Sequence, residues 1–351
     1  MTKLCWILLL TGLLTVALYL LYSSFFSSGH IAKIINDNKE HYSIILSQDD
    51  TILININAEV SRPLASVVKL IVAIEFSEQV GAGQLDKEEM VPVGVLEKYH
   101  LQHTDGQAHE DWILYLNAYE KMTSDSMISL WEVARGMMTY SSNANAEYLM
   151  DRLGIDNVNN RLEQLGIEKH SRINYPVSYL YLTPTDLKTE TDKGIYSKCQ
   201  RIHEQLKADG VSVGSFDYGI AMSPDNQKLL SDRMSSSTAL EYYELLRKIS
   251  SNGYFSHKVQ MELNSIIERD VPAGKYDIVR YGGKGGSTLW ILNNAVYLER
   301  KNGKQYKFIM FSNYPTDRND NMLLSKVMSK LIVEITDDTE KAEELISIIN
   351  K

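Results

Sequence analysis

The order of strand-forming and helix-forming segments constrains the fold of this chain more than any other feature. Strand patterns occur near both ends of the chain, while helical patterns fill residues 85–268. The expected strands are residues 41–48, 51–60, 277–286, 293–300 and 305–314. Amphipathic helices are predicted before the first strand, over residues 27–40, and after the last, over residues 321–335. This order predicts one antiparallel sheet assembled from both chain ends.

The predicted fold class is α+β, with two or three α/β/α layers and an inserted all-helical domain. A chain of 351 residues with 44% apolar residues is long enough for one large domain or two closely packed ones. We expect residues 24–65 and 270–351 to form the sheet domain and residues 66–269 to form the helical domain. The functional site is then expected in the cleft between them.

The N-terminal segment predicts a membrane anchor. Residues 4–22 carry no charge and approach the length needed to span a bilayer as a helix. Lys3 precedes this run, which favours a cytoplasmic N-terminus and places the rest of the chain outside the cytoplasm. The competing interpretation is a signal peptide whose cleavage would release a secreted protein. We favour an uncleaved anchor over residues 1–23, because no clear small-x-small cleavage site follows.

Charge and cysteine content exclude several classes of protein. The net charge of −9 and the absence of long basic runs argue against nucleic acid as a partner. The two cysteines are Cys5 and Cys199, so no disulfide can form within the exported part. We interpret Cys199 as a packing residue, because no reactive motif surrounds it. No cofactor is predicted.

The first candidate motif is Ser66-Val67-Val68-Lys69, at the start of a predicted buried helix. Side chains three residues apart share a helical face, so the Lys69 amine can approach the Ser66 hydroxyl. A lysine can activate a serine when burial or nearby positive charge lowers its pKa. Taken alone, the pattern also fits a capping serine followed by a solvated lysine.

Two further motifs carry compatible chemistry. Ser141-Ser142-Asn143 lies between two predicted helices, and its hydroxyl and carboxamide can relay a proton and bind a substrate amide. Glycines surround Lys284 on a predicted strand, which indicates close approach by a ligand or by another backbone. Such an edge can pair with an extended substrate and present an N–H to an oxyanion.

The three motifs together, in this order, resemble those of the penicillin-recognising serine hydrolases, particularly class A β-lactamases and penicillin-binding proteins. The resemblance covers roughly residues 28 to 335. It implies that Ser66 is acylated, that Lys69 activates it and that Ser141 passes a proton to the leaving amine. Residues implied in substrate binding are Asn143, Lys284, Gly286, Ser287 and Thr288, with the amides of Ser66 and Ser287 forming the oxyanion hole.

The sequence departs from the class A pattern in two places that bear on turnover. Class A enzymes resemble one another in a loop, typically E-x-x-x-N, whose glutamate positions the deacylating water. Residues 171–185 of the equivalent region contain no acid. Gly285 also replaces the usual Thr or Ser of the third motif, although Ser287 or Thr288 can compensate for the lost hydroxyl.

These features predict acyl transfer through a Ser66 ester, with a β-lactam or a D-Ala-D-Ala-type cell-wall peptide as substrate. The alternative is a binding or sensing module that acylates without efficient turnover. We expect a monomer. An additional segment near residues 98–119 is expected at the cleft entrance, and its His100, His103, His109 and Glu110 are interpreted as part of a polar surface loop. No metal site is predicted, because the metal-binding motifs are absent.

Overall fold

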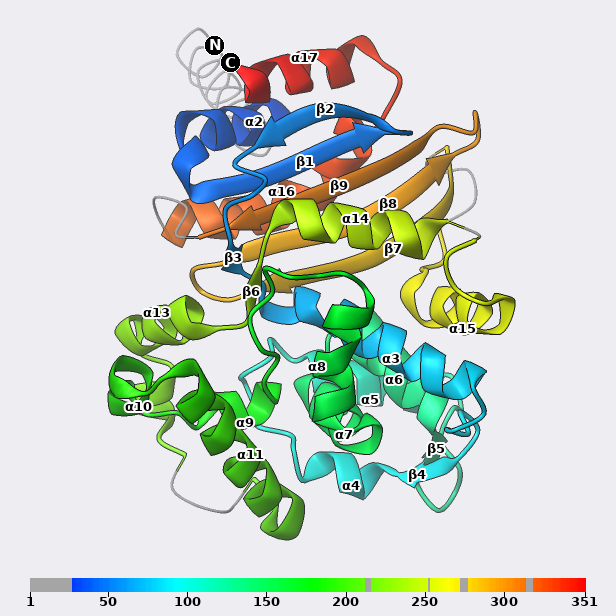
Figure 1. Cartoon of the computed structure of the whole chain (residues 1–351), viewed down its shortest axis with the longest axis vertical. Coiled ribbons are helices and arrows are strands. Elements are labelled where there is room, and N and C mark those ends of the chain that lie inside the picture. Colours follow the sequence, from blue (N-terminus) through cyan, green and yellow to red (C-terminus); the bar gives the residue numbers. More distant parts are fainter. Residues whose placement is uncertain (1–26, 212–215, 252, 272–276, 314–317) are drawn as a thin grey trace, which may run out of the picture.

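Strands from both ends of the chain form one antiparallel sheet, which confirms the predicted fold class (Figure 1). The computed structural model describes all residues except 1–26, 212–215, 252, 272–276 and 314–317. The strand order is β2-β1-β9-β8-β7. These strands are β1 (Tyr42–Gln48), β2 (Thr51–Ile56), β7 (Ile278–Ser287), β8 (Leu292–Arg300) and β9 (Gln305–Ser312). Because β1 pairs with β9, the N-terminal hairpin and the C-terminal strands share one sheet.

Both faces of the sheet are buried. Successive side chains of β9 point alternately into two different cores, one on each face. Phe308 and Met310 point into a core formed with α2 (Ser28–Asp37), α16 (Arg318–Ile335) and α17 (Glu340–Asn350). Ile309 and Phe311 join the larger core on the opposite face. The sheet therefore forms the middle of three layers.

The opposite face is covered first by α14 (Ala239–Ser250), which contacts β1, β8 and β9. The helical layer lies beside α14 and below β7 in Figure 1, and it also contacts β7 directly. Its elements are η2 (Ala65–Val68), α3 (Lys69–Gly81), α4 (Val93–Glu97), α5 (Ala108–Ala118), α6 (Leu130–Thr139), α7 (Asn143–Leu153), α8 (Ile155–Gln164), α9 (Pro176–Leu180), α10 (Pro184–Thr189), α11 (Asp192–Asp209), α12 (Tyr218–Ala221), α13 (Pro224–Arg233) and α15 (His257–Ile267). The domain boundaries at residues 65 and 269 stay a prediction, and α14 lies between them in sequence although it packs on the sheet.

Short connections complete the fold. The 3-10 turn η1 (Lys39–His41) joins α2 to β1. Two small ladders pair β3 (Arg62–Pro63) with β6 (Ser236–Ser237) and β4 (Met90–Pro92) with β5 (Met127–Ser129). In the turn between β8 and β9, Gly303 has a φ of +84°, a conformation that favours glycine.

The predicted anchor, residues 1–23, lies outside the described residues. Within the part of the chain that the structure describes, no helix combines the length and the apolar character needed to cross a membrane.

Candidate active site

Ser66 lies on the 3-10 turn η2, immediately before the buried helix α3. The sequence places Ser66 at the start of the helix itself, whereas α3 begins at Lys69. Tight 3-10 turns are frequent at helix N-termini, so this difference changes the local geometry and keeps the motif intact. Ala65 adopts a φ of +47°, which is unfavourable for a non-glycine residue. Backbone strain of this kind gathers at functional sites.

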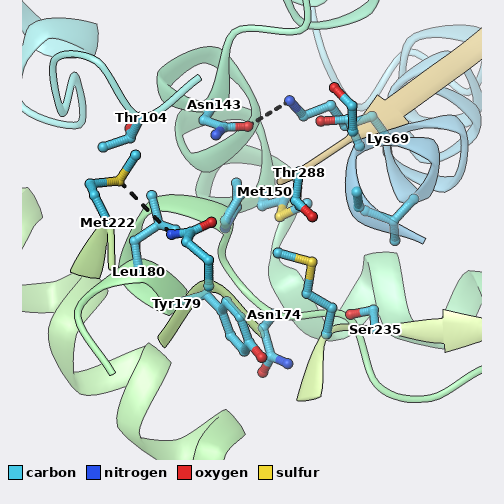
Figure 2. A pocket seen from close by; sticks show the side chains of 17 residues that line it. Lys69, Thr104, Asn143, Met150, Asn174, Tyr179, Leu180, Met222, Ser235 and Thr288 are labelled. Atoms are coloured by element: carbon cyan, nitrogen blue, oxygen red, sulfur yellow. Dashed lines mark hydrogen bonds between the residues drawn. The ribbon is translucent and has the colours of Figure 1, made fainter. Parts of the chain in front are cut away.

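The Lys69 amine is buried and points into the turn between α6 and α7. Only 1% of Lys69 is exposed, which excludes the alternative of a solvated lysine. Its Nζ donates to the Ser141 carbonyl oxygen at 2.6 Å and to Asn143 Oδ1 at 2.7 Å, the contact drawn in Figure 2. Burial lowers the pKa of Lys69 to about 7, although the charge of Asp105 raises it. A neutral amine has two N–H groups and one lone pair, so it can donate to both of these acceptors and still accept a proton.

Ser141 connects the two lysines of the motifs. Lys284 Nζ donates to Ser141 Oγ at 2.9 Å, and Lys69 Nζ lies 3.4 Å from the same oxygen. Lys284 is 3% exposed; burial, together with the charges of Lys69 and Arg269, holds its pKa well below the ordinary value. Each lysine charge therefore disfavours the other, and the Ser141 hydroxyl lies where a proton can pass from this pair toward a substrate.

The third motif approaches the nucleophile by means of Gly286. A β-carbon at this position would lie 2.7 Å from Ser66 N, 2.8 Å from Leu64 O and 3.0 Å from Val67 N. Such contacts with backbone atoms leave no room for a side chain, so glycine is required where β7 meets η2. Ser287, the next residue, lines the pocket beside Ser66.

Thr288 is one of the two residues expected to compensate for the missing hydroxyl at Gly285, and this role stays a prediction. Thr288 lines the pocket, but its Oγ1 lies 3.1 Å from Ser231 Oγ and accepts from Trp290 N at 3.1 Å. These bonds tie β7 and the following turn to α13. A β-carbon at Gly285 would make only ordinary contacts, the nearest at 3.6 Å.

The pocket that contains Ser66 is lined from both sides of the cleft. Its lining residues are Ala65, Ser66, Val68, Lys69, Thr104, Asn143, Met150, Asn174, Pro176, Tyr179, Leu180, Met222, Gln227, Met234, Ser235, Ser287 and Thr288. Among the residues that the structure describes, no aspartate or glutamate lines this pocket. A wider adjoining pocket shares Ser66 and adds Asp105, Ser141, Lys284 and Gly286.

The segment equivalent to the class A glutamate loop contributes an amide to the pocket. Asn174 lines it, and Asn174 Oδ1 is buried without a hydrogen-bond partner among the described residues. The next side chain, Tyr175, stacks on His203 with ring centroids 3.8 Å apart. The buried carboxylate of Glu147 accepts from Val177 N at 2.8 Å and from His203 Nδ1 at 3.0 Å, which fixes α9 and α11 against α7.

The additional segment lies at the cleft, as predicted, since Thr104 lines the pocket. Its interpretation as a polar surface loop is wrong for His109, which is fully buried and lies 2.9 Å from Ser142 Oγ through Nδ1. Ser142 is also buried and caps α7 by accepting from Asn145 N at 3.2 Å. The middle residue of this Ser-Ser-Asn motif therefore supports the helix behind the site.

Comparison with known families agrees with this geometry. A family model described as the β-lactamase enzyme family matches residues 28–336. The chain belongs to the β-lactamase enzyme family. No curated protein matches the sequence of this family member.

Several solved structures share the fold of this β-lactamase family member, and each match covers nearly the whole length of the solved chain. A β-lactamase from Chitinophaga pinensis is 16% identical with a TM-score of 0.55, covering 88% of this chain and 98% of its own. A class A β-lactamase from Bacteroides cellulosilyticus is 17% identical with a TM-score of 0.52, covering 92% and 99%. A mutant of PBP-A, in its acyl-enzyme complex with penicillin G, is 17% identical with a TM-score of 0.52, covering 87% and 94%.

The sequence does not predict two residues of this site, Asp105 and Asn174. Asp105 acts on the pKa of Lys69, and its Oδ2 accepts from Asn143 N at 3.4 Å. Asn174 reaches the pocket from a loop without a recognisable motif. Neither has a local sequence signal, because each is placed by packing between distant segments.

Proposed function

We propose that this β-lactamase family member is a serine acyl-transfer enzyme whose substrate is a β-lactam or a D-Ala-D-Ala-type cell-wall peptide. The observation that carries the proposal is the environment of Lys69. Its amine is buried, has a pKa near neutrality and donates to two acceptors in the turn that bears Ser141. That arrangement suits a base for the Ser66 hydroxyl, one helical turn away.

The proposed reaction begins with attack by Ser66 Oγ on the substrate carbonyl carbon. A new Oγ–C bond forms and the C–N bond of the lactam or peptide breaks, while the Ser66 proton moves to Lys69. Ser141 donates a proton to the leaving nitrogen and regains one from the lysine pair. In this scheme Asn143 orients the substrate, and Lys284 attracts its carboxylate.

The backbone amides of Ser66 and Ser287 are proposed to bind the oxyanion. The close approach of Gly286 to the Ser66 backbone supports this role, because Ser287 directly follows Gly286 and is therefore held near Ser66 across the cleft. The fold of PBP-A, whose acyl-enzyme complex with penicillin G has been solved, supports a β-lactam as an acyl donor.

Intact-mass spectrometry of the full chain, after exposure to penicillin G, tests the proposal. We expect a mass increase equal to one penicillin in the wild type and no increase in Ser66→Ala. Absence of a covalent adduct at high concentration, in a protein that retains its fold, would contradict acylation of Ser66. The same experiment followed through time measures release of the acyl group.

A second candidate function is a receptor that is acylated and released slowly. The observation that favours it is that, among the described residues, no aspartate or glutamate lines the pocket that Ser66 shares with Asn174, and the wider adjoining pocket adds only Asp105. A carboxylate is a common base for the water that hydrolyses an ester. An adduct that persists for hours would favour the receptor, and release within seconds would favour the hydrolase.

We also propose that residues 4–22 anchor the protein, with the catalytic part outside the cytoplasm. The uncharged run after Lys3 supports this location. Membrane fractionation and protease accessibility of intact cells test it. Recovery of the mature protein without residues 1–23 would instead favour a cleaved signal.

A further inference from the structure

Two histidines and two glutamates gather behind the Ser141-Ser142-Asn143 turn, outside the lining of both cleft pockets. Glu97 ends α4, His100 follows in the next turn, and His109 lies in the first turn of α5. Each of these three residues offers a potential ligand atom, and these atoms lie within 4.8 Å of one another. Glu110 Oε1 lies 3.3 Å from His100 Nε2.

The hydrogen bonds around Ser142 fix which nitrogen of His109 carries a proton. Asn145 Nδ2 donates to the Val133 carbonyl oxygen at 3.1 Å, which turns Asn145 Oδ1 toward Ser142. Ser142 Oγ donates its only proton to that oxygen at 3.0 Å. His109 Nδ1, 2.9 Å from Ser142 Oγ, must therefore be the donor in their contact.

With Nδ1 as the donor, a neutral His109 directs the lone pair of Nε2 toward Glu97 Oε1 at 3.3 Å. Two acceptors then face each other, and either a proton or a cation between them makes the contact favourable. His100 is enclosed by two carboxylates, with Nδ1 3.2 Å from Glu97 Oε2 and Nε2 3.3 Å from Glu110 Oε1. The two rings are 4.4 Å apart, so positive charges on both would repel each other. A bound cation satisfies these atoms without charging either ring.

We propose that Glu97, His100 and His109 bind a divalent transition-metal ion, with Zn²⁺ as the preferred ion. Imidazole nitrogens and carboxylate oxygens are ligands of zinc, and tetrahedral ligands at about 2.0–2.1 Å from zinc lie about 3.3–3.4 Å apart. The 3.3 Å between His109 Nε2 and Glu97 Oε1 matches that spacing. Glu110 Oε1, 3.3 Å from His100 Nε2, adds a second negative charge beside the cluster.

A hydrogen bond orients the His109 ring in the way expected for a metal ligand. A histidine that binds a metal usually donates its second ring N–H to a neighbouring oxygen, which orients the ring. Ser142 Oγ takes this role here. Ser142 also caps α7, and the adjacent Asn143 accepts from Lys69. The segment between His100 and His109 carries Thr104 and Asp105, so the ion would hold one wall of the cleft in place.

Metal binding by the full chain tests the proposal independently of any acylation. After chelation and removal of the chelator, we expect the protein to take up one Zn²⁺ per chain, measured by elemental mass spectrometry after equilibrium dialysis. Replacement by Co²⁺ should produce the visible absorption of a four-coordinate ion. Failure of the wild type to retain Zn²⁺ would overturn the proposal.

Variants then locate the ion. Glu97→Gln and His100→Gln should each weaken Zn²⁺ binding at least about 100-fold, because each removes a ligand. Glu97 is 46% exposed as a side chain, so its substitution leaves the fold in place, as circular dichroism should verify. His103→Asn is the matched control, since His103 lies in the same segment outside the cluster and should leave Zn²⁺ binding unchanged. Full binding in both ligand variants would place the ion elsewhere and overturn the assignment.

Discussion

Gly286 of β7 packs so closely against Ser66 that a β-carbon at position 286 would lie 2.7 Å from the Ser66 backbone nitrogen. Gly286→Ala must therefore displace either β7 or the turn that carries the nucleophile. We expect acylation by penicillin G to slow at least about 100-fold, since displacements near 1 Å at reacting groups have effects of this size. Stopped-flow or quenched mass spectrometry measures the rate.

The neighbouring glycine provides the control for this prediction. At Gly285 the nearest atoms to a β-carbon are Asn293 O and Asn294 Oδ1, both at 3.6 Å, which is ordinary contact. Gly285→Ala should leave acylation within about threefold of the wild type. Equal losses in the two variants would show that the close approach of Gly286 to Ser66 is unimportant.

The pKa of Lys69 predicts the pH dependence of acylation. Burial lowers it to about 7, so the neutral amine that can accept the Ser66 proton predominates only above this pH. The acylation rate should rise about tenfold per pH unit below pH 7 and level off above it. Rates measured with penicillin G between pH 5.5 and 9 provide the profile.

Asp105 gives this prediction a directional test. Its negative charge raises the pKa of Lys69, so Asp105→Asn should move the midpoint of the profile to lower pH. The amide oxygen of the variant can still accept from Ala108 N, as Asp105 Oδ1 does at 3.1 Å. A midpoint that stays in place or moves to higher pH would argue against Lys69 as the titrating base.

The sequence predicts the sheet and the three motifs because each has a local signal. Short runs of apolar and β-branched residues mark β1, β8 and β9. Ser66 and Lys69 are found by their spacing together with the order of the three motifs along the chain. The finer geometry of η2 is not predictable in this way, because it depends on β7 packing against it through Gly286.

The parts that sequence reasoning missed depend on contacts between distant segments. His109 reads as part of a polar loop because polar residues surround it, yet it is buried against Ser142, which lies 33 positions later. Glu147 belongs to no motif, but hydrogen bonds from Val177 and His203 make it the link between three helices. Burial of a polar residue among distant partners leaves no periodic trace in the chain.

The buried contact between His203 and Glu147 predicts how stability depends on pH. Burial disfavours the imidazolium, but hydrogen bonds with Asp151 and Glu147 outweigh it and raise the pKa of His203 to about 9. Because the folded pKa exceeds the unfolded value of about 6.5, this stabilisation is complete below pH 6.5 and is lost as pH rises through 9. We expect roughly 1–3 kcal/mol of unfolding free energy to depend on this group.

Denaturant unfolding at pH 6.5 and pH 9.5 measures this contribution. His203→Gln should lower stability mainly at pH 6.5 and so reduce the difference between the two conditions. His257→Gln is the matched control, because His257 is exposed on α15. A pH dependence that is the same in His203→Gln and the wild type would assign the effect to other groups.

Asn174 is the position at which a new carboxylate most directly tests whether the lack of an acid in this pocket limits release of the acyl group. Its side chain lines the Ser66 pocket, and its Oδ1 is buried without a hydrogen-bond partner among the described residues. Asn174→Asp keeps the shape of the side chain and adds a base for a hydrolytic water. Since general bases contribute about 10²–10⁴-fold, we expect the acyl-enzyme with penicillin G to be released at least about tenfold faster.

Gln227→Glu separates a positioned base from a general effect of negative charge. Gln227 lines the same pocket from α13, so the variant adds an acid on a different wall. Time-resolved intact-mass spectrometry should find faster release in Asn174→Asp and little change in Gln227→Glu. Similar release from both variants would mean that charge alone matters. Unchanged release in Asn174→Asp would mean that water does not reach the ester from this side, so the lack of a carboxylate in this pocket would not determine the release rate.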